Sequence, residues 1–310
     1  MEPREELLKR LVAEMPDPDE RGMYCHVVVK DAKGPDGKPR TETKPIDKDK
    51  IEKAVAELQK RGREAVVGLV GMLVEPLEGD DVQPIKAKYA LHVLGICVSK
   101  MTGDDARRDY ALALASQLGG ERSKGARKYI IQELQAFGRK EVVATLGKFL
   151  TDADLCDAAA MALVAIRDGA VETLRAALGH AKGACRLAVV QALGALADAG
   201  SAEALQKALG DTDREVRIAA GWGLANIGAG DAAGALTKAA DAAEGWERIQ
   251  MTNACLLLSE RLVAQGKKDK AKAIYTHLRD SRKDPSEAYV REAAEKALAA
   301  TYPPPARRHI

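Results

Sequence analysis

The chain repeats one short pattern of residues at a nearly constant interval, and this recurrence constrains its fold more than any other feature. The pattern, Arg-x-Ala-Ala/Val-x-x-Ala/Gly-Leu-x-x-Ile/Leu, is clearest at residues 217–227 and 186–196. Looser copies lie around residues 156–166, 127–137 and 291–298. A pattern that returns in this way predicts an array of small structural units that stack on one another.

The spacing of the marker leucines indicates which kind of array this is. Leu134, Leu163, Leu193 and Leu224 lie 29, 30 and 31 residues apart. This period is typical of stacked helical pairs and not of a single closed core. Leu94 precedes Leu134 by 40 residues, so we expect the early units to be longer.

Composition agrees with closely packed helices. Hydrophobic residues make up 46% of the 310 residues but aromatic residues only 4%, so the core must consist mainly of small and medium aliphatic side chains. The net charge of +2 comes from 48 basic and 46 acidic residues. This balance argues against a molecule-wide field that would attract nucleic acid or an anionic membrane, although local basic patches remain open.

Three regions are expected along the chain. Residues 1–49 should hold a helix to about residue 15 and then an arm. In the arm, residues 23–29 favour a strand that either returns through residues 40–45 as a β-hairpin or stays extended. Residues 50–300 should form the helical array, and residues 301–310, with three consecutive prolines, a tail.

Within the array we expect antiparallel helix pairs throughout. The first pair should occupy residues 51–60 and 64–77, and later helices residues 246–265 and 267–279. The last signature, at residues 290–298, stands 74 residues after the Leu224 unit, a gap that two longer units would fill.

The signature residues resemble a known family. Asp211 to Ala220, followed by Gly223-Leu224-x-x-Ile227-Gly228, is similar to the consensus of HEAT-like repeats, in particular the short variety named after phycobilisome lyases. The resemblance covers about residues 85–300. It implies an all-α fold, a right-handed α-solenoid (α-α superhelix), preceded here by a short irregular or β-hairpin segment.

The resemblance also implies how neighbouring units are linked. In this family a turn Asp and a helix Arg six residues later join successive units, a role that falls to Asp211 and Arg217. The other units depart from this pattern, since His180 and Glu121 take the place of the Asp and Cys156 that of the Arg. A continuous Asp–Arg ladder is therefore not expected.

The second helix of each pair, which lines the concave side in this family, predicts a binding surface. If the marker leucines face the core, residues two and six positions before each of them face outward. The centre of this outward surface is apolar and consists of Met161, Leu187, Val190, Ile218 and Trp222. An apolar patch with a polar rim is typical of a binding site. The outward positions are His92, Gln132, Met161, Gln191, Trp222, Lys88, Lys128, Asp157, Leu187 and Ile218.

We therefore predict a non-catalytic scaffold that binds a protein or peptide, with Trp222 as the main contact. Two other readings of the same surface are that the register is off by one position or that the arm at residues 17–49 covers it. The predicted partner-binding residues are Trp222, Ile218, Leu187, Met161, Gln191, Gln132 and His92.

Two alternative functions belong to other classes. Basic residues gather at 122–140 and 267–283, as in HEAT-like DNA glycosylases, but acidic residues interrupt both groups and an unbroken basic stripe is missing. A bilin lyase-like accessory enzyme would need an aromatic pocket, for which Tyr89, Tyr129 and Trp222 are a small supply.

Catalytic, metal-binding and cofactor-binding motifs are absent from the sequence. No phosphate loop, His-Glu-x-x-His or Gly-x-Ser-x-Gly occurs, and the five histidines have no paired ligand spacing, so we expect no cofactor. Five widely spaced cysteines favour a reducing, cytoplasmic compartment, with a secreted or periplasmic origin left open if a signal was trimmed. No apolar run approaches the length of a membrane span, and the sequence does not indicate an oligomeric state.

Overall fold

A computed structural model describes residues 3–18, 24–33, 39–74 and 83–301. The chain divides into two compact units, Met1–Leu146 (unit 1) and Gly147–Ile310 (unit 2). The predicted tail lies, except for Thr301, outside the described residues. Both units are built from stacked helices, which confirms the predicted all-α solenoid class.

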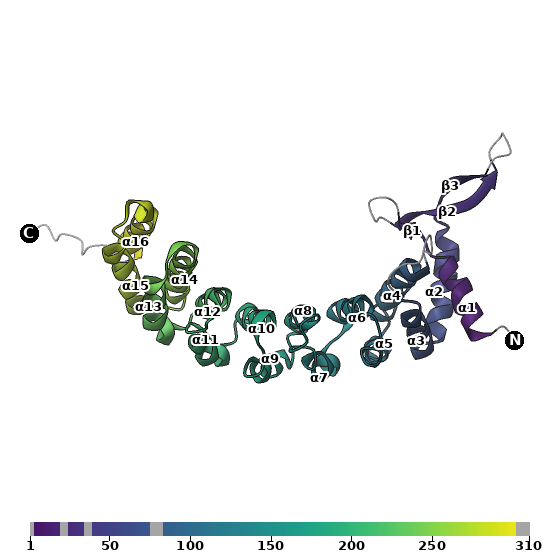
Figure 1. Ribbon diagram of the computed structural model, residues 1–310, viewed down its shortest axis with the longest axis horizontal. Coiled ribbons are helices and arrows are strands. Elements are labelled where there is room, and N and C mark those ends of the chain that lie inside the picture. The colour runs from purple at the N-terminus through teal and green to yellow at the C-terminus, as the bar shows by residue number, and fades with distance from the viewer. Residues whose placement is uncertain (1–2, 19–23, 34–38, 75–82, 302–310) are drawn as a thin grey trace, which may run out of the picture. The chain divides into compact units, whose positions relative to one another are not determined.

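Unit 1 combines helices with a small antiparallel sheet (Figure 1). The second predicted helix ends at Gly71 and is therefore shorter than expected. The elements are α1 (Arg4–Ala13), β1 (Asp17–Pro18), β2 (Tyr24–Lys33), β3 (Pro39–Pro45), α2 (Lys48–Lys60), α3 (Arg63–Gly71), α4 (Gln83–Ser99), α5 (Asp105–Ala115), α6 (Lys124–Phe137) and η1 (Lys140–Val142).

Of the two alternatives left open for the arm, the structure has the β-hairpin. Strands β2 and β3 pair antiparallel, with His26 opposite Pro45 and Val29 opposite Glu42. The run of valines at residues 27–29 suits an extended backbone because β-branched side chains pack well on a pleated strand. The short strand β1 adds to the other edge of β2, a pairing that the sequence did not predict.

A buried ion pair anchors the start of the arm on the helices of unit 1. Lys86 Nζ of α4 lies 3.3 Å from Asp17 Oδ1 and donates a hydrogen bond to the backbone oxygen of Ala13. Lys86 is 7% exposed and Asp17 3%. The arm therefore begins packed on α4, next to the end of α1.

Unit 2 is a regular array of helix pairs. Predicted helices 246–265 and 267–279 are confirmed as α14 and α15 with bounds shifted by one or two residues. The elements are α8 (Cys156–Ile166), α9 (Ala170–Leu178), α10 (Gly183–Leu196), η2 (Ala199–Ser201), α11 (Ala202–Ala208), α12 (Arg214–Ile227), η3 (Gly230–Ala232), α13 (Ala233–Ala242), α14 (Gly245–Ala264), α15 (Lys268–Ser281), η4 (Pro285–Glu287) and α16 (Ala288–Thr301), with α7 (Val143–Gly147) at the unit boundary.

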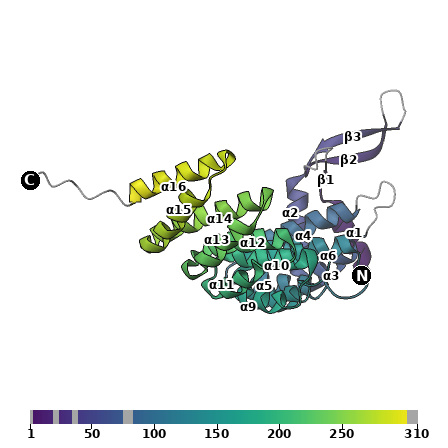
Figure 2. The same ribbon diagram turned by 60° about the vertical axis from the view of Figure 1, so that its left-hand side comes forward.

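Within unit 2 the second helices of successive pairs pack on one another. Helix α10 contacts α8 and α12, and α12 contacts α14. Figure 1 shows α8, α10, α12 and α14 on one side of unit 2 and α9, α11 and α13 on the other. In Figure 2 helices α13 to α16 follow one another in chain order, in agreement with their contacts. We call the side formed by α8, α10, α12 and α14 the second-helix face.

Helix α12 illustrates how the signature produces its local structure. The Asp213 side chain accepts a hydrogen bond from the backbone N–H of Glu215 and so caps the first turn. Gly228 ends the helix with φ of 69°, a left-handed conformation that glycine adopts without strain. Gly223 lets α12 approach α10 closely, because a Cβ atom added at Gly194 would lie 2.8 Å from the Gly223 Cα.

A series of arginine–carboxylate pairs links successive units in unit 2. Arg186 Nε lies 2.5 Å from Asp211 Oδ2, Arg217 Nε lies 2.6 Å from Glu247 Oε1, and Arg248 Nε lies 2.6 Å from Glu287 Oε1. Only the first of these pairs contains an Asp, which agrees with the expectation that no continuous Asp–Arg ladder forms; Glu takes the place of Asp in the other two pairs.

The sequence does not indicate this series of arginine–carboxylate pairs, because the acidic residues occupy different positions in each unit. Asp211 precedes its signature arginine by six residues, but Glu247 precedes Arg248 by one. Asp211 links units as predicted, through Arg186 of the preceding unit. Arg217 contacts only the backbone oxygen of Asp211 and directs its charge to Glu247.

Candidate binding surface

The marker leucines of the second helices face the core, as predicted. Leu94 and the four marker leucines are at most 2% exposed. Of the side chains two positions before them, those of α4, α6, α8 and α10 are exposed and that of α12 is half-buried. These residues are His92, Gln132, Met161, Gln191 and Trp222.

This surface contains a groove between α10 and α12 of unit 2. It has a volume of about 290 Å³ and brings together three of the predicted residues, Gln191, Ile218 and Trp222. The small residues Gly194, Ala195, Ala219 and Gly223 line the groove where the two helices approach, and Glu215 and Asn226 complete the lining.

The Trp222 side chain is held in place from the next helix. Its indole Nε1–H donates a hydrogen bond to Gln250 Oε1 of α14, at 3.2 Å. The ring is half-buried, so the polar edge is satisfied while part of the apolar ring remains accessible. This arrangement reduces the entropy that the ring would lose on contact with a partner.

The apolar centre of the predicted patch is smaller than expected. Val190 is fully buried and Ile218 is only 8% exposed, so the prediction that these two side chains face outward is wrong. Ile218 contributes only to the lining of the groove between α10 and α12. Leu187 is half-buried and Met161, at 51%, is exposed.

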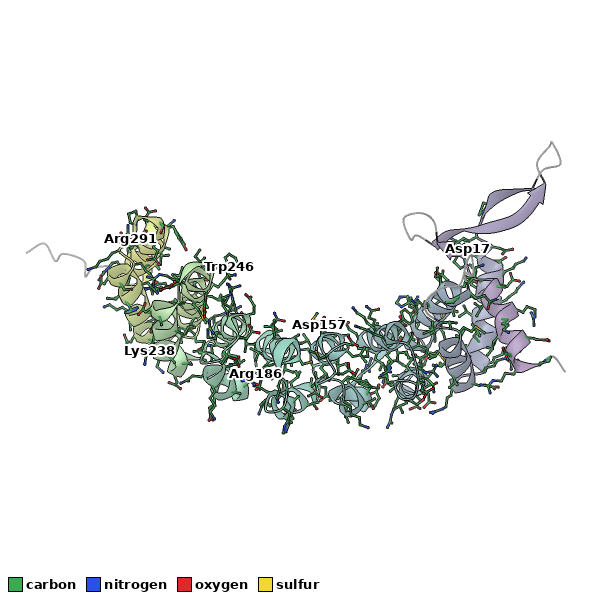
Figure 3. All side chains as sticks on the ribbon, in the orientation of Figure 1. Asp17, Asp157, Arg186, Lys238, Trp246 and Arg291 are labelled. Atoms are coloured by element: carbon green, nitrogen blue, oxygen red, sulfur yellow. The ribbon has the colours of Figure 1, made fainter. Side chains whose placement is uncertain are left out.

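Two exposed apolar residues on α14 escaped sequence analysis. Trp246 is 56% exposed and Ile249 43%. Figure 3 shows Trp246 on the side of unit 2 where Asp157 of α8 also lies, with Lys238 on the opposite side. Arg248 stands 31 residues after Arg217, so Ile249 occupies the position of Ile218 in the next unit.

In unit 1 the corresponding face carries a buried carboxylate beside His92. Glu133 is 4% exposed, and its Oε1 lies 3.1 Å from His92 Nδ1. Its Oε2 accepts a hydrogen bond from the Tyr110 hydroxyl. Burial raises the pKa of Glu133, and contacts with His92 and both Tyr129 and Tyr110 oppose this shift.

The His92 ring also packs against Phe137, with ring centroids 5.4 Å apart. His92 therefore covers a buried polar cluster, while Gln132 stands exposed on the next helix.

Many cations of the two basic clusters already contact acidic or carbonyl groups. In the first cluster Arg127 donates to the backbone oxygen of Arg122, and Arg139 pairs with Asp104 at 3.0 Å. In the second cluster three pairs form between unlike charges, which leaves a mixed surface instead of a basic stripe. These pairs are Lys270–Asp231, Arg279–Asp280 and Arg282–Asp241.

Across the described ranges, no three His, Cys, Asp or Glu side chains come together as a metal site. In the same ranges every helix is too short or too polar to cross a bilayer. Cys156, Cys185 and Cys255 are buried and Cys97 is half-buried. Burial raises the pKa of the Cys255 thiol to about 12.

Comparison with protein families agrees with the fold. Residues 171–256 match the family model of HEAT repeats, which confirms the resemblance for α9 to the first half of α14. None of the curated proteins matches the chain in sequence.

Several solved structures are similar to the chain at low identity. An engineered protein is 22% identical, with 82% of this chain and 75% of that chain covered and a TM-score of 0.38. The complex of CpcE and CpcF of phycocyanin lyase from a Nostoc species is 20% identical over 81% and 90%, with a TM-score of 0.31. Human deoxyhypusine hydroxylase in complex with glycerol is 18% identical over 96% of each chain, also with a TM-score of 0.31. Similarities this weak carry no conclusion about activity.

Proposed function

We propose that this chain, with HEAT repeats over residues 171–256, is a non-catalytic scaffold that binds a protein or peptide on its second-helix face. The observation that carries the proposal is the groove between α10 and α12, where Trp222 and Gln191 are accessible beside the buried Ile218. A fixed aromatic ring in a groove is the kind of anchor that dominates binding energy at protein interfaces.

Apolar side chains extend this surface to the neighbouring helices of unit 2. Met161 of α8 and Leu187 of α10 lie at the predicted outward positions, and α14 adds Trp246 and Ile249. Large apolar side chains that remain exposed on neighbouring helices favour a partner that covers them.

The charge of the outward positions favours a polypeptide over a nucleic acid. On α10 and α12 these positions are Leu187, Gln191, Ile218 and Trp222, none of which is charged. A polyanion would gain no counterion release from such a surface, whereas Gln191 can both donate to and accept from a peptide backbone. His92 and Gln132 form our proposed polar contacts on the second helices of unit 1.

The direct test is an affinity capture from a cell extract with wild type, Trp222→Ala and Val74→Ala. Val74 is a matched control because it is an exposed apolar residue, 59% accessible, in unit 1. We expect one or more proteins captured by wild type and Val74→Ala to be lost with Trp222→Ala. An unchanged set of captured proteins in all three samples would contradict the proposal.

Two further measurements separate the alternative functions. DNA affinity that falls steeply as salt is added would favour the nucleic-acid function, because phosphate neutralisation releases counterions. A change in visible absorbance on mixing with a bilin would favour the lyase-like function. We expect neither result.

A further inference from the structure

Unit 1 contains an apolar cavity that the proposed scaffold function does not use. Its volume is about 760 Å³, within the range of small-molecule sites. Helices α2, α3, α4 and α5 line it, and it is open to solvent on one side. The lining residues are Ala56, Gln59, Lys60, Gly62, Arg63, Val66, Leu94, Val98, Met101, Ala106, Asp109, Tyr110 and Leu112.

The deepest lining residues are apolar and belong to the core. Val66, Leu94, Val98 and Tyr110 are between 1% and 6% exposed. The Tyr110 hydroxyl donates a hydrogen bond to the backbone oxygen of Leu91 at 2.8 Å, so its polar end is already satisfied. The interior of the cavity therefore suits a hydrocarbon group and provides few partners for a polar one.

Small residues keep the cavity open. Ala56 of α2 and Ala106 of α5 line its walls with a single methyl group each. Gly62, with φ of 49°, makes the turn between α2 and α3 at the same site. A larger side chain at Ala106 would occupy space that is now empty.

The rim of the cavity carries three charged side chains and one exposed apolar side chain. Lys60 pairs with Glu57 at 3.4 Å and Asp109 is anionic, which leaves Arg63 as the cation at the rim that can meet an anionic group. Arg63 Nη2 donates to the Ser116 hydroxyl at 3.1 Å, and within the described parts of the chain it forms no ion pair with a carboxylate. Met101, 44% exposed, accepts a hydrogen bond from Gln59 Nε2.

A second cavity of similar size provides an internal comparison. It lies in unit 2 and measures about 780 Å³, but polar and charged side chains make up much of its lining. The two cavities therefore hardly differ in size. They differ in that buried apolar side chains line the cavity of unit 1. The polar lining residues in unit 2 are Glu203, Gln206, Lys207, Asp231, Gln265 and Lys267.

We propose that the unit 1 cavity binds a small amphipathic molecule with a hydrocarbon body and one anionic end group, the chemical class of a medium-chain fatty acid. The hydrocarbon lies against Val66, Leu94 and Val98, and the anion lies at the rim beside Arg63. Burial of the chain supplies most of the binding free energy. The rim charges select the anion over a neutral or cationic end group.

The test is a calorimetric titration of the full chain with decanoate below its micelle concentration, with decanol and decyltrimethylammonium as comparison ligands. We expect saturable binding of one decanoate and about tenfold weaker binding of the cation. Absence of saturable decanoate binding would overturn the site. Equal affinity for all three ligands would overturn the charge selection.

Matched variants locate the site. Ala106→Phe should weaken decanoate binding at least about tenfold by filling the cavity, while Ala202→Phe, which enters the polar cavity of unit 2, should leave it unchanged. Circular dichroism of each variant checks that the helices are intact. Arg63→Glu should reverse the preference between decanoate and the cation, and an unaltered preference would contradict the placement of the anion.

Discussion

Arg217 of α12 and Glu247 of α14 form a two-pronged ion pair, in which Nε and Nη2 of the guanidinium each lie 2.6 Å from a carboxylate oxygen. The side chains are 26% and 13% exposed, respectively. The same guanidinium also donates through Nη1 to the backbone oxygens of Asp211 and Thr212. One side chain thus joins the turn of its own unit to the first turn of the next.

Arg217→Ala should destabilise unit 2. It leaves a largely buried carboxylate without its partner and removes the bonds to two backbone oxygens, so we expect a loss of about 2–3 kcal/mol in the free energy of unfolding. Arg214→Ala on the same helix is the control, because the Arg214–Glu215 pair is about half exposed and should contribute less than about 1 kcal/mol. Urea denaturation measures the free energy of unfolding of both variants. Equal losses for Arg217→Ala and Arg214→Ala would show that the Arg217–Glu247 pair stabilises the protein no more than an exposed surface pair.

The pH dependence of stability should report the same pair. The hydrogen bond from Arg217 lowers the pKa of Glu247 below its ordinary value of 4.5, with burial opposing this shift. Because the unfolded chain binds this proton more readily, the contribution is complete above pH 4.5 and is lost as the pH falls through the lowered pKa. The stability difference between wild type and Glu247→Gln should therefore be larger at pH 7 than at pH 3. The same stability difference at pH 7 and pH 3 would contradict a lowered pKa of Glu247 in the folded protein.

The contact between α10 and α12 should be sensitive to a single methyl group. Gly194→Ala would place a Cβ 2.8 Å from the Gly223 Cα, closer than packed atoms tolerate, and the helices would have to separate. We expect a loss of about 1–3 kcal/mol in urea denaturation. Gly234→Ala in α13 meets no atom within 4 Å and should instead stabilise the protein by about 0.5–1 kcal/mol. Similar effects of the two substitutions would argue against this contact.

The marker leucines could be located from sequence because their spacing records burial. Leu163, Leu193 and Leu224 recur at the helical-repeat period and are fully buried. The side chain two positions away on a helix must then point well away from the core, which is why the orientation of Met161 and Gln191 was predictable.

The exposure of Ile218 could not be predicted in the same way. Its helical position points outward, but the distance between α10 and α12 decides whether a side chain there remains accessible. That distance depends on Gly194 meeting Gly223, a contact between two separate repeats. The unit 1 cavity depends in the same way on four helices at once, and no periodicity indicates it.

The exposure of Trp246 and Ile249 could not be predicted from the sequence for a different reason. The unit that contains them keeps the spacing of 31 residues, but Cys255 takes the place of the marker leucine. The gap after Leu224 therefore holds one unit of ordinary length and one of 43 residues, not two longer units. Arg248, which forms the third ladder pair, was the signal that could have located this unit.

The buried pair at the start of the arm should be needed for the stability of unit 1. Asp17→Asn removes the charge opposite Lys86, which is 7% exposed and whose other partner among the described residues is the neutral Ala13 oxygen. An uncompensated buried ammonium group should cost about 3 kcal/mol or more in urea denaturation. Lys86→Met combined with Asp17→Asn should recover part of this loss, since it removes the unpaired charge. If Asp17→Asn alone were as stable as wild type, the Asp17–Lys86 pair would not anchor the arm.

The two tryptophans of the chain allow the second-helix face to be examined in solution. Trp222 is half-buried and bonded to Gln250, whereas Trp246 is 56% exposed. With Trp222→Phe the remaining Trp246 should emit at longer wavelength and be quenched more strongly by acrylamide than the Trp222 that remains in Trp246→Phe. Because these are the only two tryptophans, each emission spectrum belongs to a single ring. The reverse order of quenching would mean that Trp222, and not Trp246, is the freely accessible ring, and the groove between α10 and α12 would then need a different description. A partner bound as proposed should lower the acrylamide quenching of Trp222 in Trp246→Phe, because an anchor residue loses its solvent contact at an interface.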